Sequence, residues 1–324
     1  MDVMHTILQP IETEFAIFRK MQDDLAVNPN PLLREIILHV NKQRGKQMRP
    51  MMVLLFGKMF GEVSDITYSA ALALELLHTG SLVHDDVVDE SMQRRGQASV
   101  NAIYNNKLAV LVGDYLLSTA LVFTGKSNDP RITNIIGALG QTLSDGEIFQ
   151  MFHSHEKLVS EEIYLEIIRK KTASLFASCA SAGAMSVGAP RRRVESMNRF
   201  GQMLGMAFQI VDDILDYTPD NNTGKPAAND LQERKITLPL IEVLEKVEPE
   251  LKAQILSAVE RAATDSAAVE FIREQVVKYG GVEAARATLQ RFIQRALSEL
   301  SDLEDTPYRQ ALMDLCTFVV ERDR

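Results

Sequence analysis

The chain has 324 residues, of which 46% are hydrophobic and 24% charged, and its formal net charge is -9. This composition is typical of a globular protein with a large core, and it argues against disorder. The negative charge argues against a nucleic-acid binder, which would need a basic face. The only two cysteines, Cys179 and Cys316, exclude a disulfide framework and favour a cytoplasmic location.

Apolar residues recur at spacings of three and four along nearly the whole chain, and alternating strand patterns are almost absent. This periodicity predicts an all-α protein. The N-terminus lacks the layout of a signal peptide. The most apolar run, Leu108 to Phe123, is interrupted by Asp114 and is shorter than the roughly 20 residues that a membrane span needs. We interpret it as a core helix.

The first two amphipathic helices are expected at residues 10–27 and 31–43. The segment QRGKQMRP follows, and its Pro50 suits the first position of the next helix. Lys46 and Arg49 therefore stand beside a helix N-terminus, a natural place for phosphate. An exposed polar turn is the commoner explanation of such residues.

A long helix is expected from Asp65 to Asp89, and an acidic cluster, Asp85, Asp86 and Asp89, lies at its C-terminal end within SLVHDDVVDE. Residues four apart share one helical face, so Asp85 and Asp89 are neighbours. Carboxylates on an apolar background are costly to bury unless a cation compensates them, and at this end they also oppose the helix dipole. The cluster therefore predicts a cation.

Arg94 and Arg95 follow directly, before Gly96. Two adjacent arginines by themselves suggest a solvated loop. Beside three aspartates they suggest a diphosphate clamp instead, because the planar guanidinium fork matches phosphate oxygens.

Core helices are then expected at Lys107–Phe123 and Pro130–Phe152, and a third should begin after Ser160 and end near Gly188. Lys171 and Thr172 interrupt the apolar face of the third helix. A lone buried threonine usually bonds the preceding turn.

A second acidic cluster, Asp212, Asp213 and Asp216, lies on the helix expected from Val194 to Tyr217, with Gln209 one turn before Asp213. Two matching sets of hard oxygen ligands predict Mg²⁺ that bridges to substrate phosphates. If both clusters serve one site, no domain boundary separates them, and we expect a single domain over residues 1–324.

The stretch from Thr218 to Pro239 has no apolar periodicity, and a loop of this length usually forms a lid or binding loop. Its Lys225 and Lys235 could close over an anion, and Asp230 could join a metal shell. Amphipathic helices with a break at Gly280-Gly281 follow, and they carry no recognisable chemistry.

In this order the motifs resemble the trans-polyprenyl diphosphate synthase family over nearly the whole chain, and the long-chain, octaprenyl type in particular. The matching segments are QRGKQMRP, LLHTGSLVHDDVVDESMQRRG, LVGDYLLSTA, GEIFQ, KKTASLF, FQIVDDILDYTPDNNTGKPAANDLQERKITLP and KYGG. The resemblance implies a single helical bundle around a deep central cavity, usually a homodimer, with the two aspartate motifs facing each other across its mouth. It also implies Mg²⁺, three ions per active site when substrate is bound.

The resemblance also assigns roles residue by residue. The six aspartates would bind Mg²⁺ and thereby the diphosphate of an allylic substrate, farnesyl or geranyl diphosphate. The positions that would contact that diphosphate directly are Arg94, Lys171, Lys225 and Lys235. The positions that would hold isopentenyl diphosphate are Lys46, Arg49, His78 and Arg95. Thr172 and Gln209 would stabilise the allylic carbocation, which the double bond of isopentenyl diphosphate attacks.

Product length should depend on cavity depth beside the first acidic helix. A residue one turn before the motif lies about 5.4 Å deeper, comparable with one isoprene unit. Short-chain members of the family carry an aromatic residue at that depth, whereas this chain has Gly80 and Ser81. We therefore expect a long product, around octaprenyl, for a quinone side chain, with peripheral membrane contact on release. Candidates for the tunnel floor are Ile135, Ile136 and Leu139.

Two departures from the family pattern concern substrate affinity and lid motion. The usual GGKRxRP appears as Arg44-Gly45-Lys46-Gln47-Met48-Arg49-Pro50, with one glycine and one basic residue lost. Ala228 and Arg234 stand where glycine is common.

Three alternatives remain open at this point. A terpene cyclase would share the Mg²⁺ chemistry but would not need the residues assigned to isopentenyl diphosphate. A geranylgeranyl diphosphate synthase would differ only in cavity depth. A non-catalytic subunit that modulates a partner typically loses the aspartate motifs, which are complete here.

Overall fold

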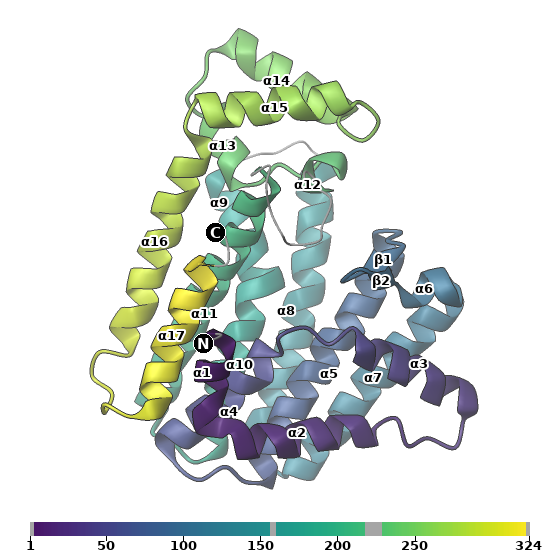
Figure 1. The fold of residues 1–324 in the computed structure, drawn as a ribbon, viewed down its shortest axis with the longest axis vertical. Helices are drawn as coiled ribbons and strands as arrows, with labels where there is room; N and C mark the ends of the chain where they lie inside the picture. The colour runs from purple at the N-terminus through teal and green to yellow at the C-terminus, as the bar shows by residue number, and fades with distance from the viewer. Residues whose placement is uncertain (1–2, 156–159, 218–228, 322–324) are drawn as a thin grey trace. The chain divides into compact units, whose positions relative to one another are not determined.

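Helices make up almost all of the chain in the computed structural model, which describes residues 3–155, 160–217 and 229–321 (Figure 1). The predicted all-α class is confirmed. The chain divides into two compact units, each built from segments that are distant in sequence.

The first unit comprises Met1–Gln141, Leu175–Gly201 and Glu299–Leu315. Its elements, in chain order, are α1 (Val3–Leu8), the 3-10 turn η1 (Gln9–Ile11), α2 (Glu12–Asp24), α3 (Pro31–Lys42), α4 (Met48–Phe60), α5 (Asp65–Val88), β1 (Gln93–Arg94), β2 (Gln97–Ala98), α6 (Val100–Ile103), α7 (Asn106–Ser127), the first part of α8 (Pro130–His155), most of α10 (Ser174–Ser186), the first part of α11 (Arg191–Asp216) and most of α17 (Pro307–Glu321). The helices predicted before residue 128 match these bounds within a few residues.

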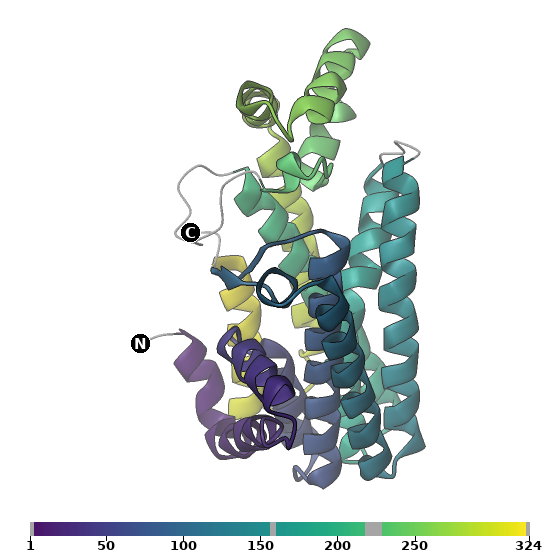
Figure 2. The same cartoon turned by 90° about the vertical axis from the view of Figure 1, so that its right-hand side faces the viewer.

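Helix α5 is the main core element of the first unit. Its residues 69–77 are all buried, which explains why this stretch is apolar on nearly every side, with Ser69 and Glu75 as the exceptions. The helix begins where the backbone N–H of Ser64 donates to Oγ1 of Thr67. It lies alongside α7, as Figures 1 and 2 both show. Gly113 permits this close approach, since a Cβ at that position would lie only 2.1 Å from Nε2 of His84.

Helix α7 has one buried and one exposed face. Ala109, Val112, Leu116 and Ala120 are buried at helical spacing. The opposite stripe exposes four large apolar side chains: Val110, Leu111, Leu121 and Val122, which are 41–62% exposed. By length and composition alone α5 and α7 could cross a membrane, but 67% of the most apolar window of α5 is buried, against 33% for α7. The predicted core helix at 108–123 is thus core on one face only.

Strands β1 and β2 form a short antiparallel hairpin, the sole pair of strands in the described part of the chain. Its two-residue turn is Arg95-Gly96, and both residues have positive φ, +52° and +73°. Such a turn matches the twist of the strands, and glycine adopts it without strain. Arg95 is therefore fixed in a left-handed conformation at the tip of the hairpin.

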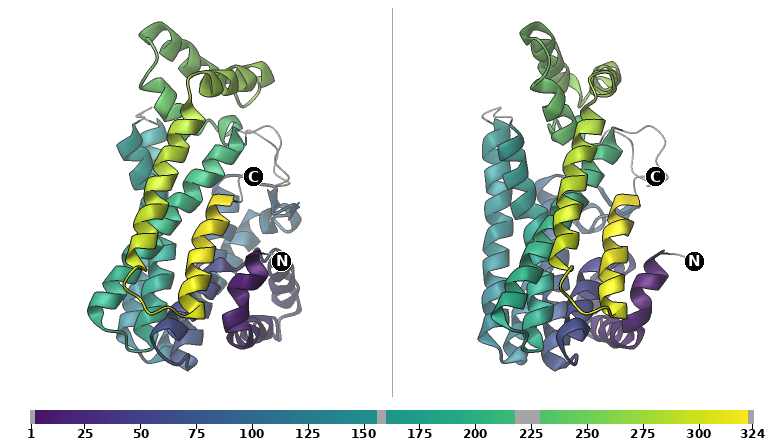
Figure 3. Two further views of the ribbon diagram at one scale, coloured as in Figure 1. Left: turned by 60° about the vertical axis from the view of Figure 1, so that its left-hand side comes forward. Right: turned by 90° about the vertical axis from the view of Figure 1, so that its left-hand side faces the viewer.

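The second unit comprises Thr142–Ser174, Gln202–Ser298 and Cys316–Arg324. Besides the remaining parts of α8, α11 and α17, its elements are α9 (Glu161–Ile168), the π-helical turn η2 (Arg169–Ala173), α12 (Asn229–Gln232), α13 (Leu238–Leu244), α14 (Pro249–Arg261), α15 (Ser266–Lys278) and most of α16 (Gly281–Glu299). A core that includes Leu240, Ile255 and Ile272 joins α13, α14 and α15, together with Tyr217, which directly follows α11. Helices α14 and α15 pack against each other, as the two green helices of Figure 3 show.

The helix predicted from Ser160 to Gly188 starts as expected, because Oγ of Ser160 accepts the backbone N–H of Ile163. It is not continuous, however, since the π-helical turn at Arg169–Ala173 separates α9 from α10. Such turns insert an extra residue and often occur at functional sites. A Cβ at Gly146 of α8 would lie 2.8 Å from Cβ of Lys170, so the missing side chain there lets the turn lie against α8.

The predicted loop from Thr218 to Pro239 is only partly within the described residues. Residues 218–228, which include Lys225 and Ala228, lie outside them. The remainder contains helices that the sequence did not predict, because residues 229–232 form α12 and α13 begins at Leu238. Arg234 has a φ of +59°, which explains why glycine is common there in the family.

Candidate active site

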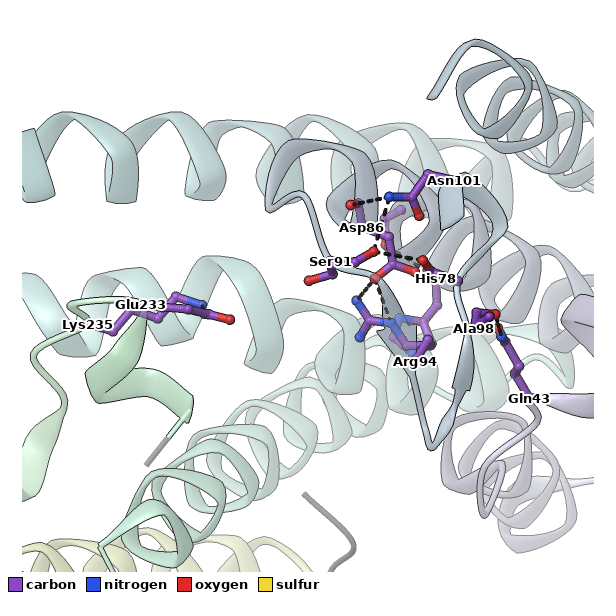
Figure 4. A network of polar contacts seen from close by, with 11 residues as sticks. Gln43, His78, Asp86, Ser91, Arg94, Ala98, Asn101, Glu233 and Lys235 are labelled. Atoms are coloured by element: carbon purple, nitrogen blue, oxygen red, sulfur yellow. Dashed lines mark hydrogen bonds and ion pairs between the residues drawn. The ribbon is translucent and has the colours of Figure 1, made fainter. Parts of the chain in front are cut away.

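The first aspartate cluster occupies the last turn of α5. Asp86 is buried, and its carboxylate accepts a hydrogen bond of 3.0 Å from Nε of Arg94 in the hairpin (Figure 4). Burial raises the pKa of Asp86, and the Arg94 guanidinium acts against that rise. Arg94 is therefore a charge partner of the cluster rather than part of a solvated loop.

The other two aspartates of this cluster are more accessible. Asp85 is half-buried and Asp89 exposed, and the backbone N–H of Asp89 donates to the carbonyl of Asp85 at 2.8 Å. Asn101 of α6, which the sequence did not single out, donates from Nδ2 to the carbonyls of Asp86 and Ser91. It ties the end of α5 to the segment that carries Arg94.

The residues assigned by resemblance to isopentenyl diphosphate all lie in the first unit. The guanidinium of Arg49 lies 5.1 Å from the ring centroid of Phe176, and that of Arg95 donates to the carbonyl of Gln43 at 2.6 Å. Burial, followed by the charges of Arg49, Arg95 and Arg94, lowers the pKa of His78 well below its ordinary value. Its imidazole is therefore neutral at pH 7. Lys46 is exposed in the preceding loop.

Glu75 is a buried carboxylate that the sequence analysis missed. It lies on α5 one turn before His78. Burial raises its pKa, and the charges of Arg49, Arg95 and Arg44 lower it. Burial has the larger effect, so the pKa of Glu75 is raised overall despite these arginines. Its position within a continuous buried helix gave no sign of this environment, because the arginines come from other segments.

The two residues predicted to control product length have different surroundings. A Cβ at Gly80 would lie 3.2 Å from the carbonyl oxygen of Gly113 and from Cγ of Leu117, so Gly80 faces α7. Ser81 is half-buried, and its Oγ donates to the carbonyl of His78 at 2.8 Å. Ile136 and Leu139, two of the predicted floor residues on α8, are buried, and Ile135 is half-buried.

The second aspartate cluster lies in the second unit, near the end of α11. Asp213 is buried, and its carboxylate accepts hydrogen bonds from the hydroxyl of Tyr164 at 2.6 Å and from Nε2 of Gln209 at 2.9 Å. Burial first, and then the charges of Asp230 and Asp212, raise the pKa of Asp213. Tyr164 was not predicted, since by spacing it looks like an ordinary core aromatic of α9.

Thr172 and Gln209, the two predicted dipoles, are brought together. Oγ1 of Thr172 donates to Oε1 of Gln209 at 2.8 Å, so a continuous chain of hydrogen bonds runs from the π-helical turn to Asp213. Lys171, from the same turn, donates to Oε1 of Gln150 at 2.8 Å and forms an ion pair with Glu147. The turn therefore presents both predicted residues in fixed surroundings.

The remaining predicted residues of this unit lie around α12. The backbone N–H of Asp230 donates to Oδ2 of Asp216 at 3.1 Å. Nζ of Lys235 is paired with Oε2 of Glu233 at 2.5 Å, a contact that Figure 4 also draws. Lys225 lies outside the described residues.

The donor set fits Mg²⁺ by its chemistry, since it consists of carboxylate oxygens, which suit a hard cation. Burial first, and then the charges of Asp230 and Asp212, disfavour the ionised form of Asp213, and a bound cation would stabilise that form. Among the residues that the structure describes, no three acidic, histidine or cysteine side chains form a closed metal site. The six aspartates remain predicted ligands.

Comparison with known proteins gives one family. The model of the family described as polyprenyl synthetase matches residues 30–276. The chain is 35% identical to the all-trans-nonaprenyl-diphosphate synthase (geranyl-diphosphate specific) of Rhodobacter capsulatus, over 99% of this chain and 98% of the relative. It is 31% identical to the octaprenyl diphosphate synthase of Escherichia coli K12, over 95% and 94% of the two chains.

Solved structures agree with these relatives. The fold matches a decaprenyl diphosphate synthase from Rhodobacter capsulatus with a TM-score of 0.93 and 32% identity, over 99% of each chain. It also matches a geranylgeranyl pyrophosphate synthase from Bacteroides thetaiotaomicron with a TM-score of 0.86 and 38% identity, again over 99% of each chain. The chain therefore belongs to the polyprenyl synthetase family and is a prenyltransferase of the polyprenyl diphosphate synthase class.

Proposed function

We propose that this enzyme adds isopentenyl diphosphate repeatedly to farnesyl or geranyl diphosphate and releases a long all-trans polyprenyl diphosphate, around octaprenyl, for a quinone side chain. The observation that carries the product length is the small, half-buried Ser81 one turn before Asp85 on α5. The relatives named for octaprenyl, nonaprenyl and decaprenyl products support a long chain.

In each cycle the bond between C1 and the diphosphate oxygen of the allylic substrate breaks, and pyrophosphate leaves. The double bond of isopentenyl diphosphate attacks the resulting cation, and a proton passes to the released pyrophosphate. Arg94, Lys171, Lys225 and Lys235 would neutralise the departing diphosphate. Thr172 and Gln209, joined by their hydrogen bond, would direct oxygen lone pairs to the cation while the site excludes water.

Asp85, Asp86, Asp89, Asp212, Asp213 and Asp216 would hold Mg²⁺, and we propose three ions per active site with substrate bound. The metal supplies charge stabilisation to the leaving diphosphate. Tyr164 and Gln209 fix the carboxylate of Asp213 from two sides, so that this ligand is already oriented. Arg94 holds Asp86 in the same way.

The proposed function is tested by incubating the enzyme with Mg²⁺, labelled isopentenyl diphosphate and either farnesyl or geranyl diphosphate. Chromatography of the dephosphorylated products should show chains around octaprenyl, and the faster reaction identifies the preferred starter. A product that stops at geranylgeranyl diphosphate would instead favour the shorter-chain alternative. The 38% identity to a geranylgeranyl pyrophosphate synthase is consistent with that alternative. No transfer of label in either reaction would refute the proposed activity.

We further propose that the enzyme is a homodimer that uses the exposed stripe of α7. Its apolar side chains, Val110, Leu111, Leu121 and Val122, lie at helical spacing on one face. Large apolar side chains exposed together on one helical face often mark an interaction site.

Replacing Leu111 by arginine should weaken dimerisation by at least tenfold, because an unpaired charge would be buried in the interface. Sedimentation velocity over a range of protein concentrations measures the change. Val277→Arg on α15, where the wild-type side chain is equally exposed, is the matched control and should leave the association state unchanged. A Leu111→Arg protein that remains dimeric would place the interface elsewhere.

Three further features complete the proposal. The chain passes from one unit to the other within α8 and α11, which supports a single functional domain over residues 1–324. Cys179 and Cys316 are buried free thiols, as expected in the cytoplasm. Exposed Ile148, Met151 and Phe152 on α8 support peripheral membrane contact during product release.

A further inference from the structure

Arg44 has an unusual environment for an arginine in a loop. Its side chain is only 19% exposed, and Nη1 forms an ion pair of 2.7 Å with Oδ1 of Asp23. Nε and Nη2 are buried and have no hydrogen-bond partner among the described residues. A buried guanidinium donor without an acceptor is energetically costly, because it has lost its hydrogen bonds to water and has formed none with the protein.

These two donors form one edge of the guanidinium. Nε–H and Nη2–H point in the same direction, and together they match two oxygens of a phosphate or carboxylate in a bidentate contact. The pair with Asp23 occupies the other end of the fork. Arg44 thus contacts Asp23 through one nitrogen, while its other two donors are buried without an acceptor among the described residues.

The chain on both sides of Arg44 contacts another arginine. The guanidinium of Arg95 lies directly against Gly45, since a Cβ there would be 2.8 Å from Cζ, and it donates to the carbonyl of Gln43 at 2.6 Å. Arg44 therefore lies between two residues that contact Arg95. Arg44, Arg49 and Arg95 all act on the buried carboxylate of Glu75. The group therefore comprises three arginines and two acids, Glu75 and Asp23.

Position 47, three residues further along the chain, is a glutamine and carries no charge. Gln47 is buried, donates to Oε1 of Gln22 at 2.7 Å and accepts from Nε of Arg19 at 3.3 Å. Position 47 therefore contributes packing against α2 and no charge.

We propose that Arg44 is an additional binding residue for the diphosphate of isopentenyl diphosphate, acting beside Lys46, Arg49 and Arg95. The inference rests on the proposed function, which places this substrate at those residues. Contact with phosphate requires a small side-chain shift to uncover the edge. The pair with Asp23 permits it, because Asp23 is 64% exposed and exposed ion pairs are weak.

The test compares Michaelis constants for the two substrates in full-length protein. Arg44→Gln should raise the KM for isopentenyl diphosphate about tenfold or more, as expected for loss of a charged hydrogen-bonded contact, and leave the KM for the allylic diphosphate unchanged. Arg44→Lys keeps the charge but loses the fork, so its KM should lie between those of the wild type and Arg44→Gln. Asp23→Asn is the matched control, because it removes the surface ion pair and should leave both constants unchanged.

A direct binding measurement separates affinity from turnover. Isopentenyl diphosphate without allylic substrate should raise the melting temperature of the wild type and of Asp23→Asn, and raise that of Arg44→Gln less. An unchanged KM in Arg44→Gln, or the same KM increase in Asp23→Asn, would overturn the role of Arg44. If the wild type itself transfers no label from isopentenyl diphosphate, the proposed function fails instead, so the two failures are distinguishable.

Discussion

Replacing Asp85 by alanine is expected to lower the rate of chain elongation by several orders of magnitude. Asp85 lies on the last turn of α5, one residue from Asp86, whose carboxylate is already held by Arg94. Its loss would remove a Mg²⁺ ligand and with it part of the charge stabilisation of the departing diphosphate. Single-turnover incorporation of labelled isopentenyl diphosphate at saturating substrate measures the effect on chemistry rather than on product release.

The matched control is Asp65→Ala, which removes a carboxylate from the opposite end of the same helix. Asp65 is exposed in the first turn of α5, so the change should cost at most about 1 kcal/mol through the helix dipole. Elongation by this variant should equal that of the wild type. If Asp85→Ala retained a substantial share of the activity, Asp85 would not be a metal ligand. In that case the cluster would be reduced to Asp86 and Asp89.

Replacing Ser81 by phenylalanine should shorten the product from around octaprenyl to roughly three or four isoprene units, because the ring would close the tunnel about one helical turn beyond the metal ligands. Ser81 suits this test because it is half-buried and bonded only through Oγ to the carbonyl of His78. Gly80 suits it less, since any side chain there meets Gly113 and Leu117 of α7 and would move the two helices apart. Chromatography of the dephosphorylated products gives the distribution of lengths.

Ser81→Ala is the control for this experiment, because it removes the same hydrogen bond without filling the space. It should leave the product length unchanged. The placement of the tunnel beside α5 is contradicted by a Ser81→Phe enzyme that still makes the wild-type distribution. A shortened product in both variants would point to the hydrogen bond with His78 rather than to the volume of the side chain.

The sequence predicted the individual helices well where an apolar face repeats over many turns. Helices α2, α3, α5, α8 and α11 begin and end within a few residues of their predicted bounds. The main differences between predicted and observed helices occur where the conformation depends on contacts with another part of the chain. The π-helical turn at Arg169–Ala173 depends on the space left by Gly146 in another helix, and no periodicity within residues 160–188 indicates it.

The contact partners of the predicted site residues could not be predicted from the sequence. Tyr164 contacts Asp213 across 49 positions of the chain, and its spacing is that of a core aromatic. The Arg95 guanidinium lies against Gly45, fifty positions earlier in the chain. Such contacts join residues whose spacing in the chain follows no period, so only the folded chain shows them.

The sequence by itself determined the fold class, the family and the residue types of the two aspartate clusters, because helical periodicity and motif spacing are properties of short segments. Only the tertiary structure decided which charges act together. It paired Asp86 with Arg94, brought three arginines within electrostatic reach of Glu75 and turned Gln47 toward α2. It also left one edge of Arg44 without an acceptor among the described residues. Burial and contact between distant segments fix these outcomes, since the energy of a charge depends on what surrounds it in space.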